Sequence, residues 1–165
     1  GMTDPSFRIG HGYDIHRFGP QRPLILGGVE IPHDRGLEAH SDGDCLSHAI
    51  ADSILGALGL PDIGHFFPND DPQYKGLHSL KILEKALEQC SSSGYRLGNV
   101  DATIVAETPK IGPHLQSMKA VLGETLEIAP SRIGIKATTN EGIRGIGQGE
   151  GIAAFAVCLL TGETT

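Results

Sequence analysis

Two residues near the N-terminus and a third further along have the types and spacing of a metal site. Asp14 and His16 are two positions apart in an alternating stretch, so both side chains point to one side of an extended strand. His48 lies in a segment with the apolar spacing of a helix. One carboxylate and two imidazoles are ligands that suit zinc, and three protein ligands leave a fourth position open, as in catalytic sites. The spacing therefore predicts a catalytic zinc site formed by Asp14, His16 and His48.

Asp44 lies one helical turn before His48 and has two interpretations. Its carboxylate could accept a hydrogen bond from the imidazole of His48 and so orient a metal ligand. Alternatively, a carboxylate in the first turn stabilises the helix through the helix dipole. The sequence leaves both interpretations open.

Three further segments carry groups that bind anions, hydroxyls or hard metal ions. His40 and Ser41 precede the start of the same helix, where free N–H groups collect anionic oxygens. Asp62 and Gly64 follow that helix, and the carboxylate of Asp62 could bind a ribose. Glu141 follows the end of a strand and could coordinate a second, harder ion such as magnesium. Each segment also has an ordinary interpretation, as a capping loop, a turn or a solvated loop.

The composition limits the class of protein. The chain has 165 residues, 39% of them hydrophobic, and we expect residues 1–165 to form one domain. A formal net charge of −7 argues against nonspecific nucleic-acid binding, and no apolar run is long enough to span a membrane. Three widely spaced cysteines favour a reducing compartment, so we predict a cytoplasmic protein. Gly1 before Met2 resembles a cloning scar, and residues 1–6 are predicted to be that scar and a flexible N-terminus.

Strand and helix patterns alternate along the chain without an internal repeat. They predict an α/β (α+β) sandwich, a mixed β-sheet with helices on one face and a small β-hairpin. The expected strands are at about residues 7–18, 99–106, 132–137 and 152–160, the hairpin at 23–31, and the helices at about 43–58, 77–93 and 114–123. Ser41 or Asp42 is expected to cap the first of these helices.

Taken together, these segments resemble the 2-C-methyl-D-erythritol 2,4-cyclodiphosphate synthase family. The resemblance covers nearly the whole chain, from Arg8 to Leu160. Its motifs are Gly-His-Gly-Tyr-Asp-Ile-His at 10–16, Ala-His-Ser-Asp-Gly-Asp at 39–44, Asp-Ile-Gly at 62–64, Gly-Asn-Val-Asp at 98–101, Thr-Pro-Lys at 108–110, Lys-Ala-Thr-Thr at 136–139 and Gly-Glu-Gly-Ile-Ala at 149–153.

The resemblance implies a phosphorus–oxygen lyase of the non-mevalonate, or methylerythritol phosphate, pathway to isoprenoid precursors. Its substrate would be 4-diphosphocytidyl-2-C-methyl-D-erythritol 2-phosphate. The 2-phosphate would attack the β-phosphorus of the same molecule, giving the 2,4-cyclodiphosphate and CMP. The resemblance also implies a homotrimer with three active sites, each between neighbouring subunits.

The resemblance further implies roles for individual residues. Asp14, His16 and His48 match zinc ligands, and Glu141 matches the ligand of a magnesium or manganese ion. The implied substrate contacts on the metal side are His40 and Ser41 for phosphate, Asp52 for the methylerythritol hydroxyls, and Asp62 and Gly64 for ribose. The neighbouring subunit would supply the cytidine and phosphate pocket with Ala106, Lys110, Ile111, Ala137, Thr138 and Thr139. Thr139 is also predicted to act in catalysis, together with the zinc ligands.

Two other functions remain open at this point. A metal-dependent phosphohydrolase would use the same metals to deliver water, and its product would be a linear phosphate. A non-catalytic trimeric binding protein would hold a structural zinc ion, which requires a fourth protein ligand.

Overall fold

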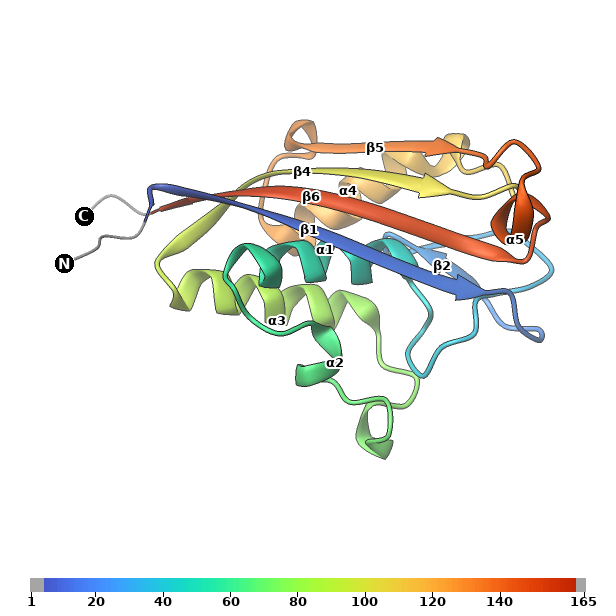
Figure 1. Ribbon diagram of the computed structural model, residues 1–165, viewed down its shortest axis with the longest axis horizontal. Helices are drawn as coiled ribbons and strands as arrows, with labels where there is room; N and C mark the ends of the chain where they lie inside the picture. The colour runs from blue at the N-terminus through green and yellow to red at the C-terminus, as the bar shows by residue number, and fades with distance from the viewer. Residues whose placement is uncertain (1–4, 163–165) are drawn as a thin grey trace.

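The computed structural model describes residues 5–162, which form one domain around a four-stranded sheet (Figure 1). The strand order is β1-β6-β4-β5, so β1 and β5 form the two opposite edges. β6 is antiparallel to both of its neighbours and β4 is parallel to β5, so the sheet is mixed, as predicted. The bounds are β1 Phe7–Arg17, β4 Tyr95–Val105, β5 Ile133–Thr138 and β6 Gly151–Gly162, with a separate hairpin of β2 Leu24–Leu26 and β3 Val29–Ile31.

The long helices cover one face of this sheet, and α1 packs directly on β1 and β6 (Figure 1). The predicted sandwich, with helices on one face and a small hairpin, is therefore confirmed. The long helices are α1 Cys45–Ala57, α3 Ser79–Ser92 and α4 Leu115–Leu126. Shorter elements are α2 Ile63–Phe66, α5 Arg144–Gly147, and the 3-10 turns η1 Pro72–Tyr74, η2 Gly112–His114 and η3 Pro130–Arg132.

Several boundaries differ from the sequence prediction. β4 begins at Tyr95 rather than near residue 99, because Tyr95 and Leu97 alternate into the core around the exposed Arg96. The predicted cap of α1 was wrong: Asp44, not Ser41 or Asp42, accepts a hydrogen bond from the backbone N–H of Ser47 at 3.0 Å. The short helices α2 and α5 lie outside the helices that the sequence predicted.

Glycines on β1 allow α1 to lie unusually close to that strand. A Cβ at Gly10 would lie 1.9 Å from the carbonyl oxygen of Ser53, and one at Gly12 would lie 1.8 Å from that of Ala49. No other residue fits at these positions without moving the helix. This close approach brings His48 on α1 alongside the inward-facing side chains of β1.

On the face of the sheet away from the helices, β1 and β6 expose large apolar side chains. The alternation along β1 directs Asp14 and His16 to the helix side and Tyr13 to the open side, where its ring lies 5.0 Å from that of Phe155. The large exposed hydrophobic residues of β1 and β6 are Phe7, Ile9, Tyr13, Ile15, Phe155 and Val157. Contiguous apolar surface of this kind marks an interaction surface in soluble proteins.

The two ends of the described chain lie together. Residues 1–4, with the predicted cloning scar, lie outside the described residues, whereas Ser6 accepts a hydrogen bond from the N–H of Gly162 at 2.6 Å. The hydroxyl of Tyr95 donates to the carbonyl of Pro5 at 2.8 Å. Residues 5 and 6, which the sequence predicted to be flexible, therefore each accept one hydrogen bond from the rest of the domain.

The three cysteines, Cys45, Cys90 and Cys158, are buried. Burial raises the pKa of the Cys45 thiol well above its usual range, and the charges of Asp14 and Asp44 raise it further. A thiolate is therefore disfavoured there, which argues against Cys45 as a nucleophile. Across residues 5–162, none of the helices combines the length and apolarity needed to cross a membrane.

Candidate metal centre and active-site cleft

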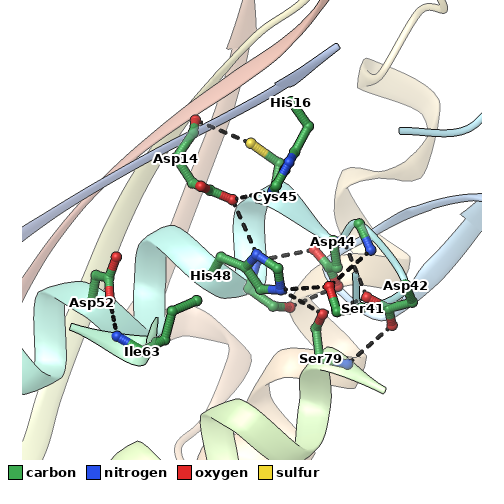
Figure 2. A network of polar contacts seen from close by, with 12 residues as sticks. Asp14, His16, Ser41, Asp42, Asp44, Cys45, His48, Asp52, Ile63 and Ser79 are labelled. Atoms are coloured by element: carbon green, nitrogen blue, oxygen red, sulfur yellow. Dashed lines mark hydrogen bonds and ion pairs between the residues drawn. The ribbon is translucent and has the colours of Figure 1, made fainter. Parts of the chain in front are cut away.

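The three predicted zinc ligands converge in the fold. Figure 2 shows Asp14 and His16 from β1 beside His48 from α1. Oδ2 of Asp14 lies 2.7 Å from Nε2 of His16 and 3.1 Å from Nδ1 of His48. All three potential ligand atoms lie within 4.8 Å of one another. The group therefore has the spacing to hold a metal ion.

One atom of this group lacks the partner that a metal ion would provide. Nε2 of His16 is buried and makes no hydrogen bond, although it is close to the Asp14 carboxylate. A metal ion bound by Asp14 and His16 together would give this nitrogen a partner. Among residues 5–162, the group contains no fourth His, Cys, Asp or Glu. The closed structural zinc site that a non-catalytic binding protein requires is therefore not found within the described chain.

The electrostatics favour a cation at this point. Burial raises the pKa of Asp14, but the nearby imidazoles of His16 and His48 outweigh it and lower that pKa to about 2. Burial lowers the pKa of His48, and the hydrogen bond and charge of Asp14 reverse this, so the net shift is upward. Asp14 is therefore ionised at neutral pH and supplies the negative charge that a divalent ion requires.

Asp44 does not orient His48 through its side chain, so that interpretation was wrong. Its carboxylate instead accepts from the N–H groups of Gly27 and Gly28 at 2.8 and 2.7 Å, and from Ser47. Burial raises the pKa of Asp44 despite these donors. Asp44 thus caps α1 and anchors the β2–β3 turn to it. It precedes the first turn of the helix, whereas the alternative interpretation placed it within that turn.

A cleft of about 490 Å³ opens beside the metal-binding group. It contains the three predicted zinc ligands and the substrate contacts predicted beside them: Asp14, His16, His40, Ser41, His48, Asp52, Asp62 and Gly64. Asp52 reaches the cleft from α1 and accepts a hydrogen bond from the N–H of Ile63 at 2.9 Å, which ties α2 to α1 (Figure 2). The structure therefore gathers side chains from β1, α1 and two loops around one polar cavity.

The residues predicted for the nucleotide side lie in a different pocket, at the opposite edge of the sheet. This pocket, of about 310 Å³, follows the ends of β4 and β5 and shares no lining residue with the cleft. It contains all six predicted residues: Ala106, Lys110, Ile111, Ala137, Thr138 and Thr139. Glu141 lies in neither pocket; it is exposed in the loop after β5 and does not join the Asp14 group. One chain thus carries two separate halves of the predicted site.

Sequence reasoning missed the residues that fix the loop before α1. The guanidinium of Arg22 donates to the carbonyls of Ala39 and Ser41 at 3.1 and 2.6 Å. Ser79, at the start of α3, lies 2.8 Å from Nε2 of His48. Both contacts join segments far apart in sequence, and no local pattern signals them.

Asp52→Asn is expected to stabilise the metal-free protein above about pH 6. Burial, reinforced by the charges of Asp62 and Asp14, raises the pKa of Asp52 from 3.8 to about 6. The folded state therefore binds this proton more tightly than the unfolded state, and stability falls as pH rises from about 4 to 6. Because the side chain is partly exposed, we expect a gain on the order of 1 kcal/mol at pH 8.

Urea unfolding in the presence of a chelator, at pH 4 and at pH 8, measures this effect. The difference between Asp52→Asn and the unsubstituted protein should appear at pH 8 and vanish at pH 4. A variant that is equally or less stable at pH 8 would show that Asp52 carries no unfavourable charge in the fold.

Fold and site together define a class of protein: a single-domain α/β protein with an open Asp–His–His metal-binding group beside a polar cleft. The sequence profile of the YgbB family matches residues 7–161. The chain belongs to this family, which agrees with the resemblance seen in its motifs.

Relatives and solved structures agree with this placement. A 2-C-methyl-D-erythritol 2,4-cyclodiphosphate synthase from Akkermansia muciniphila is 56% identical over 152 residues, covering 92% of this chain and 90% of that protein. One from Nostoc sp. is 54% identical over 155 residues, covering 94% of each. IspF of Plasmodium falciparum, in a CDP complex, is 36% identical with a TM-score of 0.86, covering 98% of this chain and 100% of that one. The bifunctional IspDF of Campylobacter jejuni is 40% identical with a TM-score of 0.92; the match covers 95% of this chain and 42% of that longer chain.

Proposed function

We propose that this protein is a phosphorus–oxygen lyase of the methylerythritol phosphate pathway. It converts 4-diphosphocytidyl-2-C-methyl-D-erythritol 2-phosphate into 2-C-methyl-D-erythritol 2,4-cyclodiphosphate and CMP. The observation that carries the proposal is the open Asp14–His16–His48 group beside a polar cleft. The names of its relatives support the reaction, and the CDP complex of the Plasmodium falciparum relative supports a cytidine nucleotide as part of the substrate.

This reaction requires that the phosphate charge be neutralised and the 2-phosphate be positioned, and it requires no general base. The attacking 2-phosphate is already anionic near neutral pH, so no side chain has to remove a proton. Asp14, His16 and His48 would hold zinc, and Glu141 would hold magnesium or manganese. When bound, these ions neutralise the phosphate charge that a protein of net charge −7 cannot neutralise by itself.

The remaining residues of the cleft would orient the substrate. Asp52 and Asp62 present carboxylate oxygens that can accept hydrogen bonds from the methylerythritol and ribose hydroxyls. His40 and Ser41 lie in the loop before α1, on the phosphate side. Holding the 2-phosphate in line with the β-phosphorus makes the attack intramolecular, which lowers the entropic part of the barrier.

A homotrimer would bring the two halves of the site together. The cleft lies by the β1 edge of the sheet and the second pocket lies at the β5 edge, so one chain cannot close its own site. A head-to-tail ring places the β5 edge of one subunit, with Lys110, Thr138 and Thr139, against the cleft of the next. The exposed apolar face of β1 and β6 would then be covered by the same faces of the other subunits. A cytoplasmic location, proposed from the cysteine content, fits this small polar substrate.

Phosphorus NMR of the authentic substrate, with zinc and magnesium present, tests the proposed reaction. We expect the resonances of the substrate to be replaced by those of a cyclic diphosphate and CMP. A linear phosphate product would support the metal-dependent phosphohydrolase instead and overturn the proposal. The same reaction with a chelator should show no turnover, because the substrate charge is then not neutralised.

A further inference from the structure

The imidazole of His48 is held on the side away from the metal-binding group by a buried serine. Nδ1 of His48 faces Asp14, whereas Nε2 lies 2.8 Å from Oγ of Ser79, the first residue of α3 (Figure 2). Ser79 is fully buried and His48 is 5% exposed, so water does not compete for this contact. Oγ of Ser41 lies further away, at 3.2 Å from the same nitrogen.

Ser79 is itself fixed by Asp42. Its hydroxyl donates a short hydrogen bond to Oδ1 of Asp42, and its backbone N–H donates to Oδ2 at 3.0 Å. Oδ1 also accepts from the N–H of Asp44 at 3.1 Å, and the imidazole of His78 lies near Oδ2. Asp42, Ser79 and His48 therefore form a chain of hydrogen bonds that leads to the metal-binding group.

Counting hydrogens along this chain fixes which nitrogen of His48 is protonated. An ionised carboxylate only accepts, so the single hydroxyl hydrogen of Ser79 goes to Asp42. The lone pair of Ser79 Oγ then faces Nε2 of His48 and can only accept from it. Nε2 must therefore carry a hydrogen. In the metal-free protein the ionised Asp14 accepts from Nδ1 as well, so a metal ion would replace the hydrogen on Nδ1 and leave the one on Nε2 in place.

We propose that Asp42 and Ser79 are positioning residues, which hold the hydrogen of His48 on Nε2 and present Nδ1 to the metal. This inference rests on the proposed metal site. Outer partners of metal-bound histidines orient the ring and fix its tautomer, and their loss weakens metal binding. A purely structural role is the alternative, because Asp42 also binds the first N–H of α3.

Zinc affinity, measured by competition with a chelator, separates the two roles. Ser79→Ala removes the acceptor and should weaken zinc binding about 10- to 100-fold. Asp42→Asn should weaken it similarly, because an amide can donate to Ser79 and turn the serine hydroxyl toward Nε2. Ser79→Thr keeps a hydroxyl and should restore most of the affinity.

Ser53→Ala is the matched control. Ser53 is also a fully buried serine, but its hydroxyl donates to the carbonyl of Ile50 at 2.6 Å within α1. The Ser53→Ala variant should lose the free energy of unfolding that one buried hydrogen bond contributes, and it should keep its zinc affinity. Zinc affinities of Ser79→Ala and Asp42→Asn equal to that of Ser53→Ala would overturn the positioning role.

A second measurement tests the hydrogen-bond chain without metal. Nitrogen-15 NMR of the histidine-labelled, metal-free protein should show a slowly exchanging proton on Nε2 of His48 that exchanges faster in Ser79→Ala. An unprotonated Nε2 in the unsubstituted protein would overturn the chain whether or not zinc binds. Failure of the unsubstituted protein to bind zinc would instead count against the proposed metal site.

Discussion

His48→Ala is expected to abolish both zinc binding and cyclisation while the protein stays folded. The substitution removes one of three ligands, and the metal supplies several kcal/mol of charge stabilisation in reactions of this kind. A loss of about 4 kcal/mol corresponds to roughly a thousandfold fall in kcat. Asp14→Ala and His16→Ala should behave alike, since each leaves two ligands.

His65→Ala is the matched control for these variants. His65 is an exposed histidine of α2, close to the cleft in sequence but not among its lining residues. The His65→Ala variant should bind one zinc ion per subunit and convert the substrate at the normal rate. Metal analysis by mass spectrometry, with circular dichroism to check folding, decides the matter: stoichiometric zinc in all three ligand variants would refute the assignment.

The metal-binding group could be predicted from the sequence because its signals are local. The alternation around Asp14 and His16 and the helical spacing around His48 each indicate which way a side chain points. Their meeting depends on α1 lying against β1, which Gly10 and Gly12 permit. Glycines in a strand pattern are a sign of close backbone approach, so even this contact had a signal in the sequence.

The support of the site could not be predicted in the same way. Arg22 reaches the loop before α1 from a distant segment, and Ser79 reaches His48 from the start of another helix. Neither residue lies in a periodic pattern that fixes its partner. Asp44 was ambiguous for a related reason: a carboxylate at the start of a helix can face its own helix or a neighbour, and here it faces both Ser47 and the hairpin turn.

The division of the predicted site into two pockets became visible only in the fold. The motif around Lys110 and that around Thr139 have no feature that excludes them from the cleft of their own chain. The strand order places these motifs far from that cleft, because β1 and β5 are opposite edges of one sheet. The expectation of a shared site, which came from the family resemblance, thus gains a physical basis and remains to be tested.

Mixing two inactive variants should restore activity if the site is shared between subunits. His48→Ala destroys the metal side, and the double variant Lys110→Ala/Thr139→Ala destroys the nucleotide side, so each homotrimer should be nearly inactive. Unfolding and refolding the two together produces mixed trimers. With random assembly of equal amounts, half of the sites have an intact metal side and half of those an intact neighbour, so about a quarter of the full activity should return.

The control mixes His48→Ala with Asp14→Ala, which both damage the metal side, and no activity should return from that pair. Native mass spectrometry must first show that mixed trimers have formed. A site contained within one chain cannot recover, because every subunit then carries a lesion. Mixed trimers that are no more active than their parents would therefore exclude a shared site and leave the two pockets of this chain without a common function.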